Sequence, residues 1–91
     1  MIYEYKNETY DLDKVTRLYP AATVEVPGGE RAQVSLEWAD LKSDKIVIAY
    51  YVLVFDFDPV GEAPVNRKEL KCATQDELFS VMQEVNSYFK K

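Results

Sequence analysis

The fold of this chain follows from residues 45–58, which read Lys-Ile-Val-Ile-Ala-Tyr-Tyr-Val-Leu-Val-Phe-Asp-Phe-Asp. The run is rich in the β-branched and aromatic side chains that strands favour, and Pro59 follows its last aspartate. A strand with one buried face alternates apolar and polar residues, whereas here both alternating sets are apolar. The run therefore predicts a central strand, covered on both faces, in a small β-rich domain.

Shorter strands are predicted on both sides of this run. We expect them over residues 2–6, 9–12, 15–19, 22–26, 31–38 and 65–73. Pro20 has no backbone N–H, so it bends the chain or marks a sheet edge. The strand over 65–73 carries several charges and is expected at a sheet edge, where lysines deter further pairing.

The apolar pattern decides the register of the hairpin around Pro27-Gly28-Gly29-Glu30. A two-residue Gly-Gly turn would mix apolar and polar residues on each face. A three-residue loop over 27–29 instead pairs Val24 with Ala32 and Ala22 with Val34, which keeps one face apolar. We therefore predict the longer loop, with a glycine adopting the positive φ that it requires.

The segment from 31 to 45 is harder to assign. Residues 31–38 alternate, with Ala32, Val34, Leu36 and Trp38 on one side, which predicts a strand. Residues 39–45 then turn into the central strand. Their register stays open, because both faces of that strand would accept a partner.

The C-terminal segment predicts a helix. Thr74-Gln75-Asp76-Glu77 fits a capping box, in which the Thr hydroxyl and the Glu carboxylate each accept a hydrogen bond from a free backbone N–H. Apolar residues then recur at helical spacing, namely Leu78, Val81, Met82, Val85, Tyr88 and Phe89. This stripe must cover a sheet face.

These elements predict an α+β domain over residues 1–91. It consists of an antiparallel β-meander of about five or six strands, with one C-terminal helix packed on the sheet. The order of the elements is similar to that of small pleckstrin-homology-like modules. This is an analogy of element order alone, and a fold does not settle a function.

Composition and charge exclude several classes of protein. The net charge is −5 and the basic residues are scattered, apart from Arg67, Lys68 and Lys71, which argues against nucleic-acid binding. Cys72 is the one cysteine, so no internal disulfide forms and a reducing compartment is expected. The N-terminus has no signal-peptide pattern, and residues 45–58 are too short to span a bilayer. We therefore expect a cytoplasmic protein that does not bind membranes.

Residues 52–60, Val-Leu-Val-Phe-Asp-Phe-Asp-Pro-Val, resemble the first motif of the haloacid-dehalogenase-type phosphatases. The resemblance implies Asp56 as a nucleophile, Asp58 as a general acid/base and Mg²⁺ between them. It covers nine residues, and Pro59 stands where the family has Gly. Only 33 residues follow Asp58, too few for the family's parallel α/β core. We therefore expect no phosphatase activity.

Other catalytic and metal-binding chemistry has little support in the sequence. The chain has no histidine, which is the commonest general base and metal ligand. Asp56, Asp58 and Glu62 would supply oxygen ligands to a hard cation, but Asp-Pro at a strand end is typical of a turn. We interpret Cys72 as a small buried hydrophobe. The sequence thus predicts a protein that is not an enzyme and has no cofactor or metal.

The candidate interaction surface comprises Tyr3, Tyr5 and Tyr10, in the N-terminal hairpin. An exposed strand edge there would offer unpaired N–H and C=O groups to a partner strand. The alternative is that these tyrosines lie at the rim of the core, with their hydroxyls hydrogen-bonded or at solvent.

The leading hypothesis is a non-enzymatic binding module that acts through a protein partner or its own dimer. One alternative is an inhibitor or immunity-type protein whose acidic face covers a basic site on a toxin or enzyme, since charge complementarity speeds such association. Another is a small-ligand binder that uses a tyrosine-lined face, to which Tyr50 and Tyr51 would contribute. The sequence names neither the partner nor the pathway.

Overall fold

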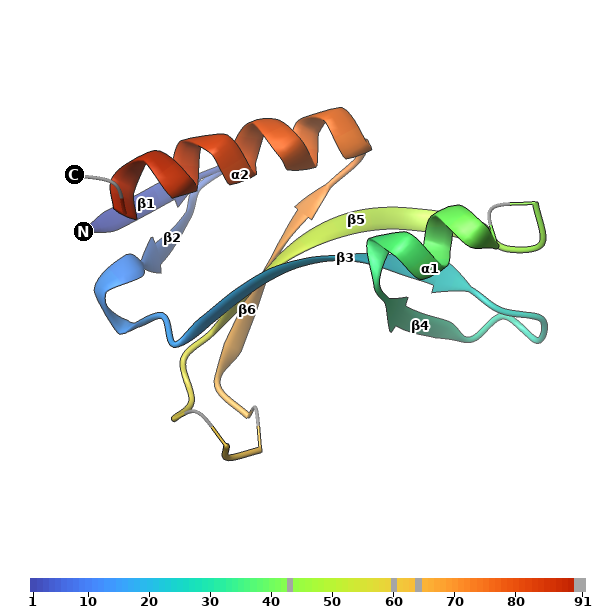
Figure 1. Cartoon of the computed structure of the whole chain (residues 1–91), viewed down its shortest axis with the longest axis horizontal. Helices are drawn as coiled ribbons and strands as arrows, with labels where there is room; N and C mark the ends of the chain where they lie inside the picture. Colours follow the sequence, from blue (N-terminus) through green and yellow to red (C-terminus); the bar gives the residue numbers. More distant parts are fainter. Residues whose placement is uncertain (43, 60, 64, 90–91) are drawn as a thin grey trace.

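The computed structural model describes residues 1–42, 44–59, 61–63 and 65–89 and forms two antiparallel sheets with helices (Figure 1). The strands are β1 (Ile2–Tyr5), β2 (Glu8–Asp11), β3 (Arg17–Glu25), β4 (Arg31–Val34), β5 (Val47–Asp56) and β6 (Arg67–Cys72). The helices are the 3₁₀ turn η1 (Leu12–Lys14), α1 (Leu36–Leu41) and α2 (Gln75–Phe89). β1 and β2 pair alone, while the other strands form one sheet in the order β4-β3-β5-β6. The predicted α+β class, with about six strands and a packed C-terminal helix, is confirmed.

The predicted register of the β3–β4 hairpin is also confirmed. Val24 stands opposite Ala32 and Ala22 opposite Val34. Gly28 and Gly29 have φ values of 101° and 85°, in the left-handed region that glycine tolerates best. The buried residues Ala22 and Val24 thereby reach the core together.

Strand β3 is longer than predicted, because the expected strands 15–19 and 22–26 merge into one. Pro20 lies inside it, opposite Leu53 of β5. β4 pairs only with residues 22–25, so no described strand pairs with residues 17–21 on the side away from β5. A proline is tolerated at such an edge because its missing N–H has no partner to lose. We call residues 17–21 the free edge of β3.

The predicted strand over residues 31–38 is wrong beyond Val34. The chain turns at Ser35 into α1, and the Ser35 hydroxyl accepts the backbone N–H of Trp38 at 3.1 Å as a helix N-cap. Ala39 of this short helix is buried against Ala22 and Val24. The alternation of Leu36 and Trp38 was therefore a coincidence of a short window, and the Ser35 cap and the burial of Ala39 both favour the helix.

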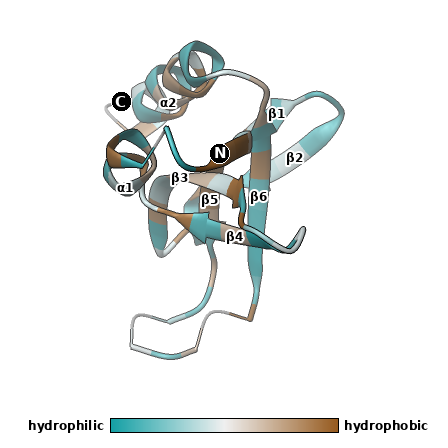
Figure 2. Cartoon of the chain, turned by 90° about the vertical axis from the view of Figure 1, so that its right-hand side faces the viewer, coloured by the Kyte–Doolittle hydropathy of each residue, from teal (hydrophilic) through white to brown (hydrophobic). Residues whose placement is uncertain are grey.

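The helices and the β1–β2 hairpin all cover one face of the four-stranded sheet (Figures 1 and 2). On this face the ring of Tyr10 stacks on that of Phe55, with centroids 4.4 Å apart. The main core lies here and comprises Tyr3, Tyr10, Leu12, Leu53, Phe55, Leu70, Cys72, Leu78, Val81 and Val85.

The opposite face of the sheet is covered by side chains alone. Among the described residues no helix or strand lies over it (Figure 1). Ala21, Val52 and Val54 are nevertheless buried there, beneath the partly buried Tyr19 and Tyr50. The prediction that β5 is covered on both faces is thus correct for the side chains of residues 52–56, whereas Val47 is exposed, and elements of structure cover only one face.

Helix α2 begins with the predicted Thr74 cap, while the Glu77 carboxylate binds the N–H one residue before Thr74 and not that of Thr74 itself. The Thr74 hydroxyl accepts the Glu77 N–H at 3.1 Å, and the Glu77 carboxylate accepts the Ala73 N–H at 2.8 Å. The apolar stripe is narrower than predicted. Leu78, Val81 and Val85 are buried and Met82 and Tyr88 pack partly, whereas Phe89 is exposed.

Candidate functional site

The tyrosines of the N-terminal hairpin belong largely to the core. Tyr3 and Tyr10 are each 3% exposed, and Tyr5 packs partly against them. The Tyr3 hydroxyl donates to Glu84 at 2.7 Å, and burial raises the Tyr3 pKa well above its ordinary value. Tyr5 donates to Glu77, and this hydrogen bond raises its pKa to about 12. The hydroxyls of Tyr3 and Tyr5 therefore attach the hairpin to α2. Because Tyr3 and Tyr10 are buried, they leave almost no surface for a partner.

Asp56 and Asp58 build the end of β5. The Asp58 carboxylate accepts the backbone N–H of Asn66 at 2.7 Å and its side-chain amide at 3.1 Å. The backbone hydrogen bond from Asn66 lowers the Asp58 pKa. Asp56 accepts the N–H of Asp58 at 3.3 Å, and the Thr16 hydroxyl donates to the Asp56 carbonyl at 3.0 Å. The Asp58 carboxylate thus joins the two ends of the loop between β5 and β6, while the Asp56 oxygens bind Asp58 and Thr16.

Within the described part of the chain, no three His, Cys, Asp or Glu side chains are grouped so that they could hold a metal ion. Cys72 is buried in the main core, and this burial raises its pKa to about 11. Its sulfur is therefore a protonated thiol at neutral pH, packed as a small apolar group.

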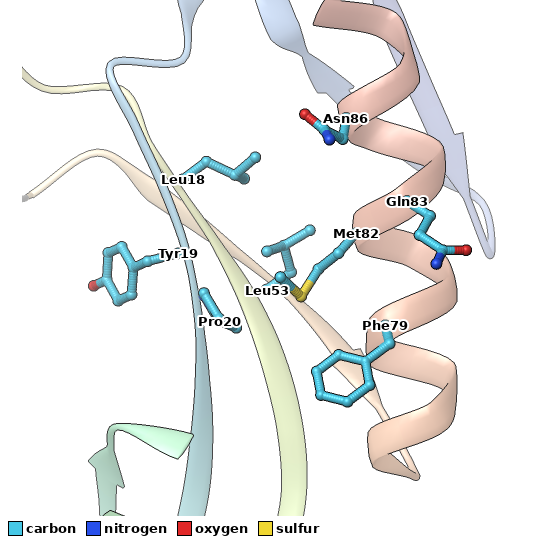
Figure 3. A pocket seen from close by; sticks show the side chains of 8 residues that line it. All are labelled: Leu18, Tyr19, Pro20, Leu53, Phe79, Met82, Gln83 and Asn86. Carbon is cyan, nitrogen blue, oxygen red and sulfur yellow. The ribbon is translucent and has the colours of Figure 1, made fainter. Parts of the chain in front are cut away.

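An apolar groove lies between α2 and the free edge of β3 (Figure 3). Its volume is about 470 Å³. The lining residues, which define the β3–α2 groove, are Leu18, Tyr19, Pro20, Leu53, Phe79, Met82, Gln83 and Asn86. Leu53 is buried at its floor, and the Met82 side chain extends from α2 toward it (Figure 3).

The groove exists because the sheet is narrower here. β4 ends at Val34, and no described strand pairs with residues 17–21 on the side away from β5, so this side of α2 faces a strand edge instead of another element. Leu18 is consequently 37% exposed and Phe79 is 43% exposed. Large apolar side chains that remain open together on one surface often mark an interaction site.

The chemistry of the groove is neutral. None of its lining residues is charged at neutral pH, although the chain carries 27 charged side chains. Its polar side chains are the amides of Gln83 and Asn86, each of which can donate and accept hydrogen bonds, whereas the Tyr19 ring points away from Leu53 and Met82 (Figure 3). The lining therefore offers apolar contact with a few neutral hydrogen-bonding groups at its rim.

Sequence reasoning missed this site. Phe79 carried a usable signal, because it falls beside the buried stripe of α2 and is a large aromatic residue on a face expected to be polar. Leu18 carried none, since a leucine in a strand is ordinary. Its exposure follows only from the length of β4.

The comparisons with known proteins leave the site to be interpreted from its chemistry. A scan against protein-family models, a search of curated proteins and a search of solved structures each found no match. None of the described helices combines the length and apolar character needed to cross a bilayer.

Proposed function

We propose that this protein is a non-enzymatic binding module whose β3–α2 groove accepts an apolar side chain of a partner protein. The observation that carries the proposal is the neutral groove itself, with Phe79 and Leu18 open at its walls. A volume of about 470 Å³ accommodates one or two large side chains. Burial of each such side chain would contribute about 1.5–3 kcal/mol to the association.

The lining favours a polypeptide over a reactive small molecule. Aromatic residues and Met are enriched at the buried centres of protein interfaces, and Phe79 and Met82 supply them here. The amides of Gln83 and Asn86 suit the N–H and C=O groups of a peptide backbone. The lining contains no carboxylate, imidazole, thiol or amine to act as an acid, base or nucleophile at neutral pH.

A selection from displayed random peptides tests this proposal. Peptides are selected on the wild type after depletion on Met82→Lys, which places a charge in the groove. The selected peptides are then titrated into isotope-labelled protein. We expect them to share a large apolar residue and to shift the amide resonances of Leu18, Tyr19 and residues 79–86.

A matched control is Val47→Lys, which alters an exposed apolar residue that does not line the groove. This variant should bind the peptides as the wild type does. Peptides that bind Met82→Lys equally well, or that shift resonances elsewhere, would refute the proposal. Sedimentation equilibrium adds one distinction, because a dimer that Met82→Lys weakens would identify the partner as a second copy of this chain.

A further inference from the structure

The uncovered face of the four-stranded sheet collects the arginines of this protein. Strand register places Arg17 opposite Asp56, and Asp56 opposite Arg67, so their side chains emerge on the same face. Arg31 of β4 lies 5.9 Å from the ring centroid of Tyr50, which packs on that face. Arg17, Arg31 and Arg67 are all the arginines in the chain. We call them, with Lys71, Tyr19 and Tyr50, the arginine face.

Tyr19 joins the arginine face to the β3–α2 groove. Tyr19 lines the groove at the free edge of β3. Its ring packs on the opposite face of the sheet, against Ala21, Val52 and Val54. Arg67 Nη1 donates to the Tyr19 hydroxyl at 3.2 Å. The Arg17 guanidinium lies 5.5 Å from the Tyr19 ring centroid. Two guanidinium groups therefore stand beside one end of the groove, on the far side of a single tyrosine.

Neither of these two guanidinium groups takes part in an ion pair within the described residues. The ion pairs there are Met1–Asp13, Lys6–Glu77, Lys14–Asp11 and Arg31–Glu25. Asp56 lies between Arg17 and Arg67 in the register, but its side chain is buried and accepts the N–H of Asp58. Arg17 and Arg67 are both exposed. Their remaining N–H groups are available to a carboxylate of a partner molecule. A guanidinium binds a carboxylate through two parallel hydrogen bonds.

From this arrangement we infer that the partner presents an acidic polypeptide segment, with an apolar side chain in the groove and neighbouring carboxylates on Arg17 and Arg67. The inference rests on the proposed function of the groove. A nucleic acid fits less well, because Glu25 and Glu69 stand on the same face as the arginines. These carboxylates interrupt the continuous basic track that a phosphate backbone needs.

Two short synthetic peptides test the inference. They share a central Phe and differ only in their flanking residues, which are Glu in one peptide and Gln in the other. At low salt we expect the Glu peptide to bind about tenfold more tightly, as for one charge-assisted pair. Arg17→Gln combined with Arg67→Gln should remove this difference and leave the Gln peptide unaffected. Lys42→Gln combined with Lys45→Gln, a matched loss of two exposed charges elsewhere, should preserve it.

The outcomes separate this inference from the proposed function. Equal affinities with groove resonances shifted by both peptides would overturn the acidic preference and leave the groove intact. If neither peptide shifts the groove resonances, both ideas fall. A Glu-peptide preference that survives loss of Arg17 and Arg67 would also overturn the inference. Tighter binding of an oligothymidylate than of the Glu peptide at Arg17 and Arg67 would likewise overturn the inference.

Discussion

Replacing Glu77 by Ala should destabilise the fold by about 2–3 kcal/mol, because one carboxylate joins the hairpin to α2. It accepts the Tyr5 hydroxyl, the Lys6 ammonium at 2.9 Å and the Ala73 N–H at 2.8 Å. Tyr5 and Lys6 belong to the N-terminal hairpin, and Ala73 precedes the helix. The substitution therefore removes the carboxylate's bond to the chain just before α2 and a tether between distant segments, while the Thr74 cap on the residue 77 N–H remains.

The magnitude follows from the exposure of each partner. The Glu77 side chain is 24% exposed, so its bonds compete only partly with water. The hydrogen bond from the Ala73 N–H contributes about 1 kcal/mol, and the hydrogen bond from Tyr5 about 1–1.5 kcal/mol. Lys6 is largely exposed, so its ion pair contributes between about 0 and 0.5 kcal/mol.

Urea denaturation followed by circular dichroism measures this loss. Asp76→Ala is a matched control, because Asp76 also lies in the first turn of α2 and its effect is limited to the helix dipole, about 0.5 kcal/mol. If Glu77→Ala and Asp76→Ala lie within about 0.5 kcal/mol of each other, the tether does not act as described.

The same carboxylate predicts a pH dependence. The hydrogen bond from Tyr5, followed by that from Lys6, lowers the Glu77 pKa from 4.5 to about 2. Because the folded-state pKa is the lower one, the stabilisation is complete above about pH 4.5 and is lost as the pH falls toward 2. Glu77→Gln should flatten this part of the stability profile. If the free energy of unfolding of Glu77→Gln falls between pH 4.5 and 2 as steeply as that of the wild type, Glu77 is not the group responsible.

Three further outcomes follow from burial and capping. Leu53→Ala should cost about 2–5 kcal/mol in urea denaturation because Leu53 is 1% exposed, whereas Leu41→Ala, at 79% exposure, should cost under about 0.5 kcal/mol. The Cys72 thiol, whose pKa is raised to about 11, should react slowly with a disulfide reagent at pH near 8 and rapidly after unfolding, as absorbance would show. Ser35→Ala should cost about 1 kcal/mol through loss of the α1 cap, and a cost near zero would show that packing alone holds α1.

Local signals in the sequence were sufficient for much of the fold. The loop over residues 27–29 was predictable because a one-residue slip of β4 would turn Val34 away from the buried Ala22 and Val24. The start of α2 was predictable because Thr74 and Glu77 satisfy backbone donors within one turn. In both cases the deciding interactions join residues that are close in sequence.

Local signals failed where two of them competed. Residues 35–38 alternate as a strand does, yet Ser35 also offers an N-cap, and burial of Ala39 against β3 favoured the helix. Pro20 was predicted to bend the chain or mark an edge. It marks an edge inside a continuous strand, because β4 is too short to reach it.

By itself, the sequence determined the elements that short-range patterns specify, including the central strand β5, the hairpin register and the capped helix α2. Tertiary structure alone decided which side chains remain on the surface. Tyr3 and Tyr10 became buried under α2, while Leu18 and Phe79 were left exposed across a groove. The physical reason is that exposure depends on which elements end where. The length of β4 opens the groove, and the confinement of both α-helices to one face leaves the arginines on the other.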